Sequence, residues 1–279
     1  MQTWLIYSLI AGLFSIAMQY VNRRGLRGKH DPTAYAWWFE VIRTLFFLLL
    51  LPFDYSVNLT SAKDVVSLII PGLIEIAAVY SFMKMFAHAQ LSVSTIISRL
   101  RLIWLPLFAV LFLGEILTFR EYIGIVLIFL GAVGTTSIKQ IRADPGIRHS
   151  FLFAIFAGLL SITMKTASSL GSTSVVMLAM SIPSIMALPF LMKHPLARLK
   201  ISGKVRLKHN LLATLCNSVA MILYLSALRM APVGLVFSVF NGIQVLSVIV
   251  GIIAFKETDQ IPQKLLGTAV SFAGILLLA

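Results

Sequence analysis

Ten apolar runs, each long enough to cross a lipid bilayer, follow one another along the chain. A spanning helix needs about 20 predominantly apolar residues. Because lipid offers the backbone no hydrogen-bond partners, each run must satisfy its own backbone groups, as a helix does. A β-barrel would instead need strands of about 9–11 residues that alternate between apolar and polar. The sequence therefore predicts an all-α integral membrane protein with ten transmembrane helices. They cover residues 4–21, 35–53, 65–86, 93–113, 122–138, 151–167, 175–192, 211–228, 233–255 and 261–279.

The composition of the 279 residues agrees with this prediction, because 59% are hydrophobic, 12% are charged and the mean hydropathy is +0.94. An ordinary soluble domain is about 45–50% apolar and about 25% charged. These values exclude a soluble enzyme, a disordered protein and a nucleic-acid binder of the usual kind. The net charge of +13 is interpreted as a topology signal and as contact with anionic lipids. The single cysteine, Cys216, excludes an internal disulfide and a cysteine-rich metal site.

Basic residues in the loops predict the orientation of the chain. The loops after the odd-numbered runs hold 15 Lys and Arg residues, whereas the other loops hold four. The positive-inside rule places the first group in the cytoplasm, so we expect both termini outside, in a bacterial inner or plasma membrane. We expect no cleavable signal peptide, because the first run starts at Trp4 with no basic segment before it. The 15 are Arg23, Arg24, Arg27, Lys29, Lys139, Arg142, Arg148, Lys193, Arg198, Lys200, Lys204, Arg206, Lys208, Lys256 and Lys264, and the four are Lys63, Arg120, Lys165 and Arg229.

The two halves of the chain resemble each other. Ala11–Met18 in the first run matches Ala157–Met164 in the sixth, and Ala89–Glu115 aligns with Ala231–Glu257 at a constant offset. Each half holds five runs, and an odd number makes the second half enter the membrane from the opposite side. Such inverted repeats are common in secondary transporters, where exchanging the conformations of the two halves alternates access to a central site. The predicted repeats are residues 1–144 and 145–279.

Short motifs near the ends of the fourth and ninth runs carry a family resemblance. They are Phe112-Leu113-Gly114-Glu115 with Ile123-Gly124, and Phe255-Lys256-Glu257 with Leu266-Gly267. With them, the chain resembles the drug/metabolite transporter superfamily, in its EamA-like branch of ten helices. The resemblance implies a basket of helices around a central cavity lined mainly by spans 1, 3, 4, 6, 8 and 9. It marks Glu115 and Glu257 as family features, which we interpret as structural or gating residues.

Six charged residues lie inside the predicted spans, where each costs roughly 2.5–3.5 kcal/mol on insertion scales and needs a partner or a water-filled cavity. They are Glu40, Arg43, Glu75, Lys84, Arg99 and Arg101. Glu40 and Arg43 share a helix face, as an internal ion pair or as a charged wall of the site. Glu75 is either paired with Arg99 or a proton carrier. Lys84 lies near a helix end and can reach the interface.

Arg99 and Arg101 cannot both point into one cavity, because two residues turn a helix by about 200°. We expect Arg99 to bind substrate, because its position in the second repeat holds the polar Asn241. Arg101 would then pair with Glu40, Glu75 or lipid. Ser238 and Gln244 share the polar face of Asn241. Interhelical hydrogen bonds, worth about 0.6 kcal/mol each, are the alternative role for that face.

Other candidates follow from the repeat and from helical spacing. Asn217 and Tyr224 in the eighth run correspond to Glu75 and Phe82 in the third, and each pair shares a face at a spacing of seven. Trp104 could stack on substrate or serve in packing. The candidate substrate-binding residues are Arg99, Glu75, Glu40, Arg43, Asn241, Gln244, Asn217, Tyr224, Phe82, Trp104 and Ser238, with Glu75 as the candidate for proton coupling. Gly124, Gly131, Gly267 and Gly274 are expected to allow close helix contact.

Motif searches narrow the function. The sequence holds no His-Glu-x-x-His run, no Gly-x-Ser-x-Gly elbow and no P-loop, so we expect neither an enzyme nor an ATP-driven pump, and no cofactor or metal. With four cations and two carboxylates inside the spans, the sequence predicts a secondary transporter or exchanger for a small anionic or zwitterionic metabolite, such as an amino acid or a phosphorylated anion. Its expected partners are lipids, a proton or a counter-substrate, and it is expected to work as a monomer. The alternatives are a lipid or lipid-carrier flippase and a membrane-embedded enzyme.

Overall fold

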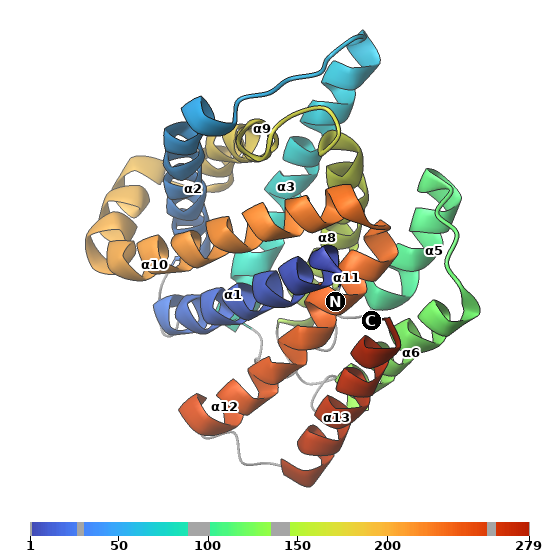
Figure 1. Ribbon diagram of the computed structural model, residues 1–279. Helices are drawn as coiled ribbons and strands as arrows, with labels where there is room; N and C mark the ends of the chain where they lie inside the picture. The colour runs from blue at the N-terminus through green and yellow to red at the C-terminus, as the bar shows by residue number, and fades with distance from the viewer. Residues whose placement is uncertain (1, 27–30, 89–100, 135–145, 256–260, 279) are drawn as a thin grey trace.

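A computed structural model describes residues 2–26, 31–88, 101–134, 146–255 and 261–278, and over these residues the chain is helical (Figure 1). An isolated bridge joins Val57 to Gly171. The prediction of an all-α fold is confirmed. The elements are α1 (Thr3–Leu26), α2 (Pro32–Asp54), α3 (Ala62–His88), α5 (Arg101–Leu113), α6 (Phe119–Gly134), α8 (Ile147–Ala167), α9 (Thr173–Ala187), η1 (Leu188–Leu191), α10 (Pro195–Met230), α11 (Val233–Ile243), η2 (Gln244–Leu246), α12 (Ser247–Phe255) and α13 (Ile261–Leu278).

These helices account for all or part of each predicted run. Seven described segments are long and apolar enough to cross a membrane, namely α1, α2, α3, α8, α9 with η1, α10 and α13. Helix α5 is the second part of the fourth run, and residues 93–100 of that run lie outside the described residues. Large apolar side chains such as Leu49, Phe53 and Leu111 are exposed on the surface, which suits a surface that faces lipid.

The packing of the helices repeats between the two halves. Helix α1 packs against α10, and its counterpart α8 packs against α3. Helix α2 packs against α10, and its counterpart α9 packs against α3. Helix α1 also packs against α11, and its counterpart α8 packs against α5. Every one of these contacts is reproduced when each element is exchanged for its partner five spans away. This pattern is what two inverted repeats produce around a two-fold axis.

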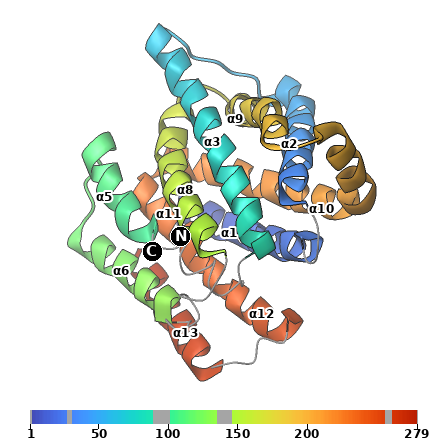
Figure 2. The same ribbon diagram turned by 180° about the vertical axis from the view of Figure 1, so that it is seen from behind.

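The fifth and tenth spans, α6 and α13, lie side by side in both views (Figures 1 and 2). Glycines make this approach possible. A Cβ atom on Gly131 would lie 2.4 Å from the carbonyl oxygen of Gly267, and one on Gly274 would lie 2.6 Å from that of Gly124. Any larger residue at Gly131 or Gly274 would force the two backbones apart, which is the small-residue logic of packing in membranes.

Helix α10 differs from its prediction. The sequence predicts a span over 211–228 that follows a basic loop, but the helix begins at Pro195 and has 36 residues. At 1.5 Å per residue it is about 54 Å long, well beyond the hydrocarbon core of about 30 Å. Leu, Lys and Arg favour helices and Pro suits the first helical position, so the basic segment continues the helix instead of forming a loop.

Candidate substrate site

A cavity of about 150 Å³ lies between the two halves and is lined by helices of both. The lining includes α2 and α9, through Arg43 and Met180, in addition to the spans that the family resemblance implies. Most of the wall is apolar and is built from flexible or flat side chains, Met18, Met85, Met164, Met180 and Met221 together with Phe39, Phe82, Phe86, Phe153, Phe237 and Phe240. The polar lining consists of Ser15, Gln19, Arg43, Glu75, Arg101, Ser161, Asn217, Tyr224, Asn241 and Gln244. Such a site offers a few fixed polar groups in an apolar pocket.

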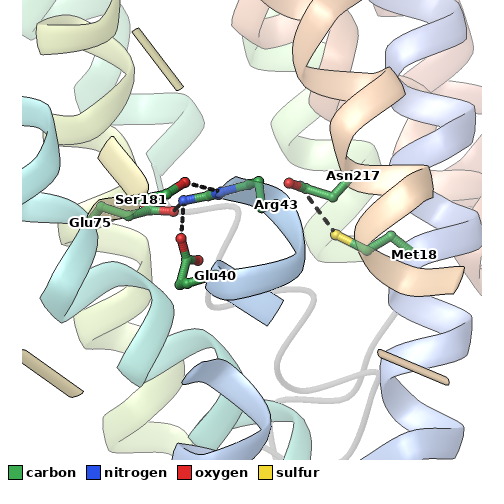
Figure 3. A network of polar contacts seen from close by, with 6 residues as sticks. All are labelled: Met18, Glu40, Arg43, Glu75, Ser181 and Asn217. Atoms are coloured by element: carbon green, nitrogen blue, oxygen red, sulfur yellow. Dashed lines mark hydrogen bonds and ion pairs between the residues drawn. The ribbon is translucent and has the colours of Figure 1, made fainter. Parts of the chain in front are cut away.

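One polar group of the wall is an ion network built on Arg43 (Figure 3). Its Nη2 lies 2.5 Å from Oε2 of Glu40 and 2.7 Å from Oε1 of Glu75, and its Nε donates to the Ser181 hydroxyl at 2.8 Å. All three ionisable side chains are buried, Glu40 completely. Two carboxylates therefore share one guanidinium, and the network carries a net charge of −1 when all three groups are ionised.

The partner of Glu75 differs from the one expected. The sequence offered Arg99 or Arg101, but within the described residues Glu75 pairs with Arg43 of the neighbouring helix α2. Glu40 also pairs with Arg43, one helical turn away, as the sequence allowed. Only Arg43 and Glu75 of this network line the cavity, and Glu40 lies behind them with its Oε1 buried and without a partner in the described part of the chain.

A second charged group, Arg101, faces the same cavity in different surroundings. Its guanidinium carbon lies 5.1 Å from the ring centres of both Phe153 and Phe237. Its Nη2 donates to Oδ1 of Asn241 at 2.6 Å, and its Nε is buried. Among the described residues no carboxylate lies within 4.0 Å of this guanidinium. A buried cation held by rings and a neutral amide can attract an anion from outside the protein.

This arrangement differs from the prediction for the fourth span. The sequence favoured Arg99 as the substrate ligand because its repeat partner is Asn241, and Arg99 lies outside the described residues. In the structure Asn241 binds Arg101, and Arg101 lines the cavity instead of pairing with Glu40 or Glu75. The repeat alignment located the level of the site, and Arg101 is the described arginine at that level.

Neutral groups complete the wall. Nε2 of Gln19 donates to Oε1 of Gln244 at 2.8 Å and so links α1 to η2. Nδ2 of Asn217 lies 3.4 Å from the sulfur of Met18 (Figure 3). Tyr224 and Phe82 also line the cavity, and the ring of Tyr224 lies 4.9 Å from that of Phe240.

One predicted candidate does not line the cavity, and the side chains of two other candidates lie outside the described residues. Ser238 is completely buried and does not line the cavity, although it lies only three residues before Asn241 on the same helix. The side chain of Trp104 and the whole of Glu257 lie outside the described residues.

Sequence reasoning missed Ser15, Met18 and Gln19, although the repeat contained a signal for two of them. Ser15 and Met18 align with Ser161 and Met164 in the matching segments of the first and sixth runs. All four of these side chains line the cavity. The internal match therefore marked cavity-lining positions as well as the repeat itself.

The comparisons with known proteins identify the family. The sequence model of the EamA-like transporter family matches residues 2–137 and again residues 145–279. This chain belongs to the EamA-like transporter family. A solved structure described as "Crystal structure of protein" is 15% identical in sequence. The match covers 96% of this chain and 97% of the other, and its TM-score of 0.63 shows a shared fold. No curated protein matches the chain. The family membership makes the chain a membrane transporter of the drug/metabolite type, and its apolar helices make it an integral multi-pass protein.

In this EamA-like transporter, Glu115 joins the two repeats at one end of the cavity. Gly114 ends α5 in the left-handed conformation, with φ of +65°, which suits glycine and turns the chain. The Glu115 carboxylate then accepts the backbone N–H groups of Val233 at 2.7 Å and of Gly234 at 3.2 Å. A carboxylate at a helix N-terminus stabilises the first turn, here that of α11.

Lys165 closes the same end of the cavity from α8. Its ammonium donates to the carbonyl oxygen of Leu228 and, at 2.8 Å, to that of Ala231, where α10 ends. Ser161 and Tyr224, four residues earlier on these two helices, line the cavity. In the described structure, the ends of α8, α10 and α11 are therefore tied together one helical turn beyond the cavity.

Proposed function

We propose that this transporter moves a small zwitterionic or anionic metabolite, with an amino acid that has an apolar side chain as the best fit, by alternating access. The observation that supports this most directly is Arg101, a buried cation in the cavity with rings and an amide around it but no described carboxylate within 4.0 Å. A carboxylate or phosphate on the substrate would match the planar fork of its guanidinium.

The network around Arg43 would take the other charge of a zwitterion. It carries two carboxylates for one guanidinium, and Glu75 is the carboxylate that reaches the cavity. An ammonium group beside Glu75 would balance the net charge of −1. The methionines and phenylalanines of the wall would then accommodate an apolar side chain, because methionine adapts its shape to irregular ligands.

The closure by Glu115 and Lys165 supports an alternating-access mechanism. The Glu115 contact joins the two repeats, and the Lys165 contact joins α8 to the end of α10, both at one end of the cavity. An opposite conformation would break them and close the other end. The basic loops would face the cytoplasm, so the contacts around Glu115 and Lys165 would form the outer gate.

The orientation can be tested separately. A cysteine in place of Lys200, in a version of the protein without Cys216, should resist an impermeant maleimide in intact cells. A cysteine in place of Lys63 should react readily. The reverse pattern would invert the orientation and exchange the inner and outer gates, but it would leave the substrate proposal unaffected.

The substrate proposal is tested by a thermal-shift screen of the purified protein with zwitterionic, anionic and cationic metabolites. A ligand at a hundredfold excess over its dissociation constant stabilises a protein by about 2.7 kcal/mol. A zwitterionic or anionic hit should lose this effect in Arg101→Gln and keep it in the control Lys84→Gln, since Lys84 lies over Tyr80 and does not line the cavity.

Counterflow of the hit in liposomes then separates transport from binding. Substrate-dependent exchange supports a transporter, whereas its absence together with scrambling of labelled lipid would favour the alternative of a flippase. An organic cation that stabilises the protein equally in Arg101→Gln would contradict the proposed site for an anionic group.

A further inference from the structure

The first part of α10, from Leu196 to Lys208, presents an exposed surface with a regular pattern. Lys200, Lys204 and Lys208 are exposed and spaced four residues apart, so they form a lysine row along one side of the helix. Exposed apolar residues flank this row, Leu196 and Leu207 on one side and Ile201 and Val205 on the other. The surface is therefore amphipathic in an unusual order, with cations in the middle and apolar side chains at both edges.

The opposite side of this segment is fixed to α2. The Arg198 guanidinium pairs with Asp31, the residue that caps the N-terminus of α2. The indole N–H of Trp38 donates to the carbonyl oxygen of Leu199 at 2.9 Å, and Gly203 allows the same indole ring to approach α10. A side chain that donates a hydrogen bond to a helix carbonyl oxygen in this way favours a bend in the helix. Helix α10 bends in this region in both views (Figures 1 and 2).

The position of the lysine row relative to lipid follows from the residues after it. Leu211, Leu212 and Leu215 are exposed and continue the same side of the helix. In a spanning helix such residues face the hydrocarbon core. Lys200 precedes Leu211 by about 16 Å of helix at 1.5 Å per residue, so we expect the row to lie at the level of the headgroups, outside the core.

We propose that the lysine row binds the headgroups of anionic phospholipids in the leaflet on this side of the membrane. The ammonium groups would contact the lipid phosphates while Leu196, Ile201, Val205 and Leu207 enter the upper acyl region. Phe190 in η1 is 90% exposed beside the start of α10, and an aromatic side chain there suits the same interfacial level. This proposal does not depend on the transported substrate.

The test measures thermal unfolding of the purified protein in detergent micelles that contain phosphatidylglycerol or phosphatidylcholine. Phosphatidylglycerol should raise the midpoint temperature of the wild type more than phosphatidylcholine does. The combined variant Lys200→Gln, Lys204→Gln and Lys208→Gln should lose at least half of this difference. The matching combination of Lys→Arg changes should keep it, because the positive charges remain.

Two controls locate the effect. The variant Lys63→Gln with Arg120→Gln removes exposed cations from the other group of loops and should respond to phosphatidylglycerol as the wild type does. Glycerol 3-phosphate, the soluble headgroup, should not reproduce the shift at the same concentration. An undiminished shift in the triple Gln variant, or an equal shift with the soluble headgroup, would overturn the proposal. Because the three lysines are exposed, we expect the lipid-free midpoint of the triple variant to match the wild type, and the lipid shift is measured against it.

Discussion

The cavity holds two buried arginines whose charges are compensated in different ways. Arg43 contacts two carboxylates and a hydroxyl, all from the first half or from α9. Arg101 contacts an amide and two aromatic rings. All three belong to the second half, Phe153 to α8 and Phe237 and Asn241 to α11. The first arginine has more negative charge around it than it needs, and the second has less. The comparison teaches that buried charge can be overcompensated by carboxylates at one position and surrounded only by neutral groups at another, and the proposed function rests on this difference.

The strongest way to break the comparison is Arg43→Gln. This change leaves Glu40 and Glu75 buried without their shared cation, and breaking a buried ion pair typically costs about 3–5 kcal/mol. We expect a loss of that size in the free energy of unfolding, measured by denaturant titration in detergent. Changing Glu40 and Glu75 to Gln as well should recover most of it. A loss below about 1 kcal/mol in the single variant would show that the network contributes little to stability.

The matching change on the other side, Arg101→Gln, should affect transport more than stability. It removes a buried cation that forms no described ion pair, so unfolding should change by no more than about 1 kcal/mol, as for an ordinary hydrogen bond. Counterflow should fall more than tenfold, which corresponds to about 1.4 kcal/mol. Equal transport by Arg101→Gln and the control Lys84→Gln would remove Arg101 from the site.

The two carboxylates of the Arg43 network allow a sharper comparison. Glu75 reaches the cavity and Glu40 does not. If the network carries a proton during transport, Glu75→Gln should abolish the proton dependence of whatever exchange remains, whereas Glu40→Gln should keep the proton dependence. Proton-driven uptake in liposomes with an imposed pH gradient measures this difference. Intact proton coupling in Glu75→Gln would make Glu75 a structural residue.

A smaller effect is expected at the end of the cavity. Glu115→Ala removes the carboxylate that caps α11, and the loss of such a cap costs roughly 0.5–2 kcal/mol. Glu121→Ala is the control, because Glu121 caps its own loop through Thr118 and joins no second repeat. Only the Glu115 change should increase the labelling of a cysteine at Ser161 from the side of Glu115. Equal labelling in both variants would make the contact structural.

The smallest effect is expected for the ion pair at the aqueous edge, Asp31 with Arg198. Burial raises the pKa of Asp31, but the hydrogen bond from Arg198 and those from the Ala34 and Thr33 amides outweigh it, so the pKa is lowered. A lowered folded-state pKa contributes stability that is present above the unfolded value and is lost as the pH falls through the folded value. Unfolding of Asp31→Asn should therefore differ from the wild type by less than about 1 kcal/mol at neutral pH, and less again near pH 3. A difference that grows on acidification would contradict the pairing.

The sequence predicted more of the fold than of the site. The lengths of the apolar runs predicted ten spanning helices, because in lipid each apolar segment must pair its own backbone hydrogen-bonding groups. The sequence also predicted close helix contact at Gly131, and the structure shows that the neighbour there is Gly267 of α13. The prediction failed for 195–210, where the basic segment is a helix, since charge marks the aqueous phase but does not exclude a helix that packs on another.

The site was less predictable because a helix that is apolar on all sides does not reveal which side faces its neighbours. Asn241 and Gln244 were recognised as polar residues in an apolar span, and both line the cavity. Ser238 on the same helix does not, and Arg101 is the described arginine that contacts Asn241, whereas the predicted Arg99 lies outside the described residues. Which residues face the cavity depends on how each helix is rotated about its own axis, and spacing alone leaves that rotation undetermined.

The sequence by itself determined the solvent, the number of spans and the inverted repeat, because these depend on the length, order and parity of apolar runs. The tertiary structure decided that Arg43 serves both Glu40 and Glu75, and that Arg101 lies between Phe153 and Phe237. Those pairings join helices α2 with α3, and α5 with α8 and α11. A charge inside lipid must find a partner, but which partner it finds is fixed only when neighbouring helices pack and bring particular side chains within hydrogen-bond distance.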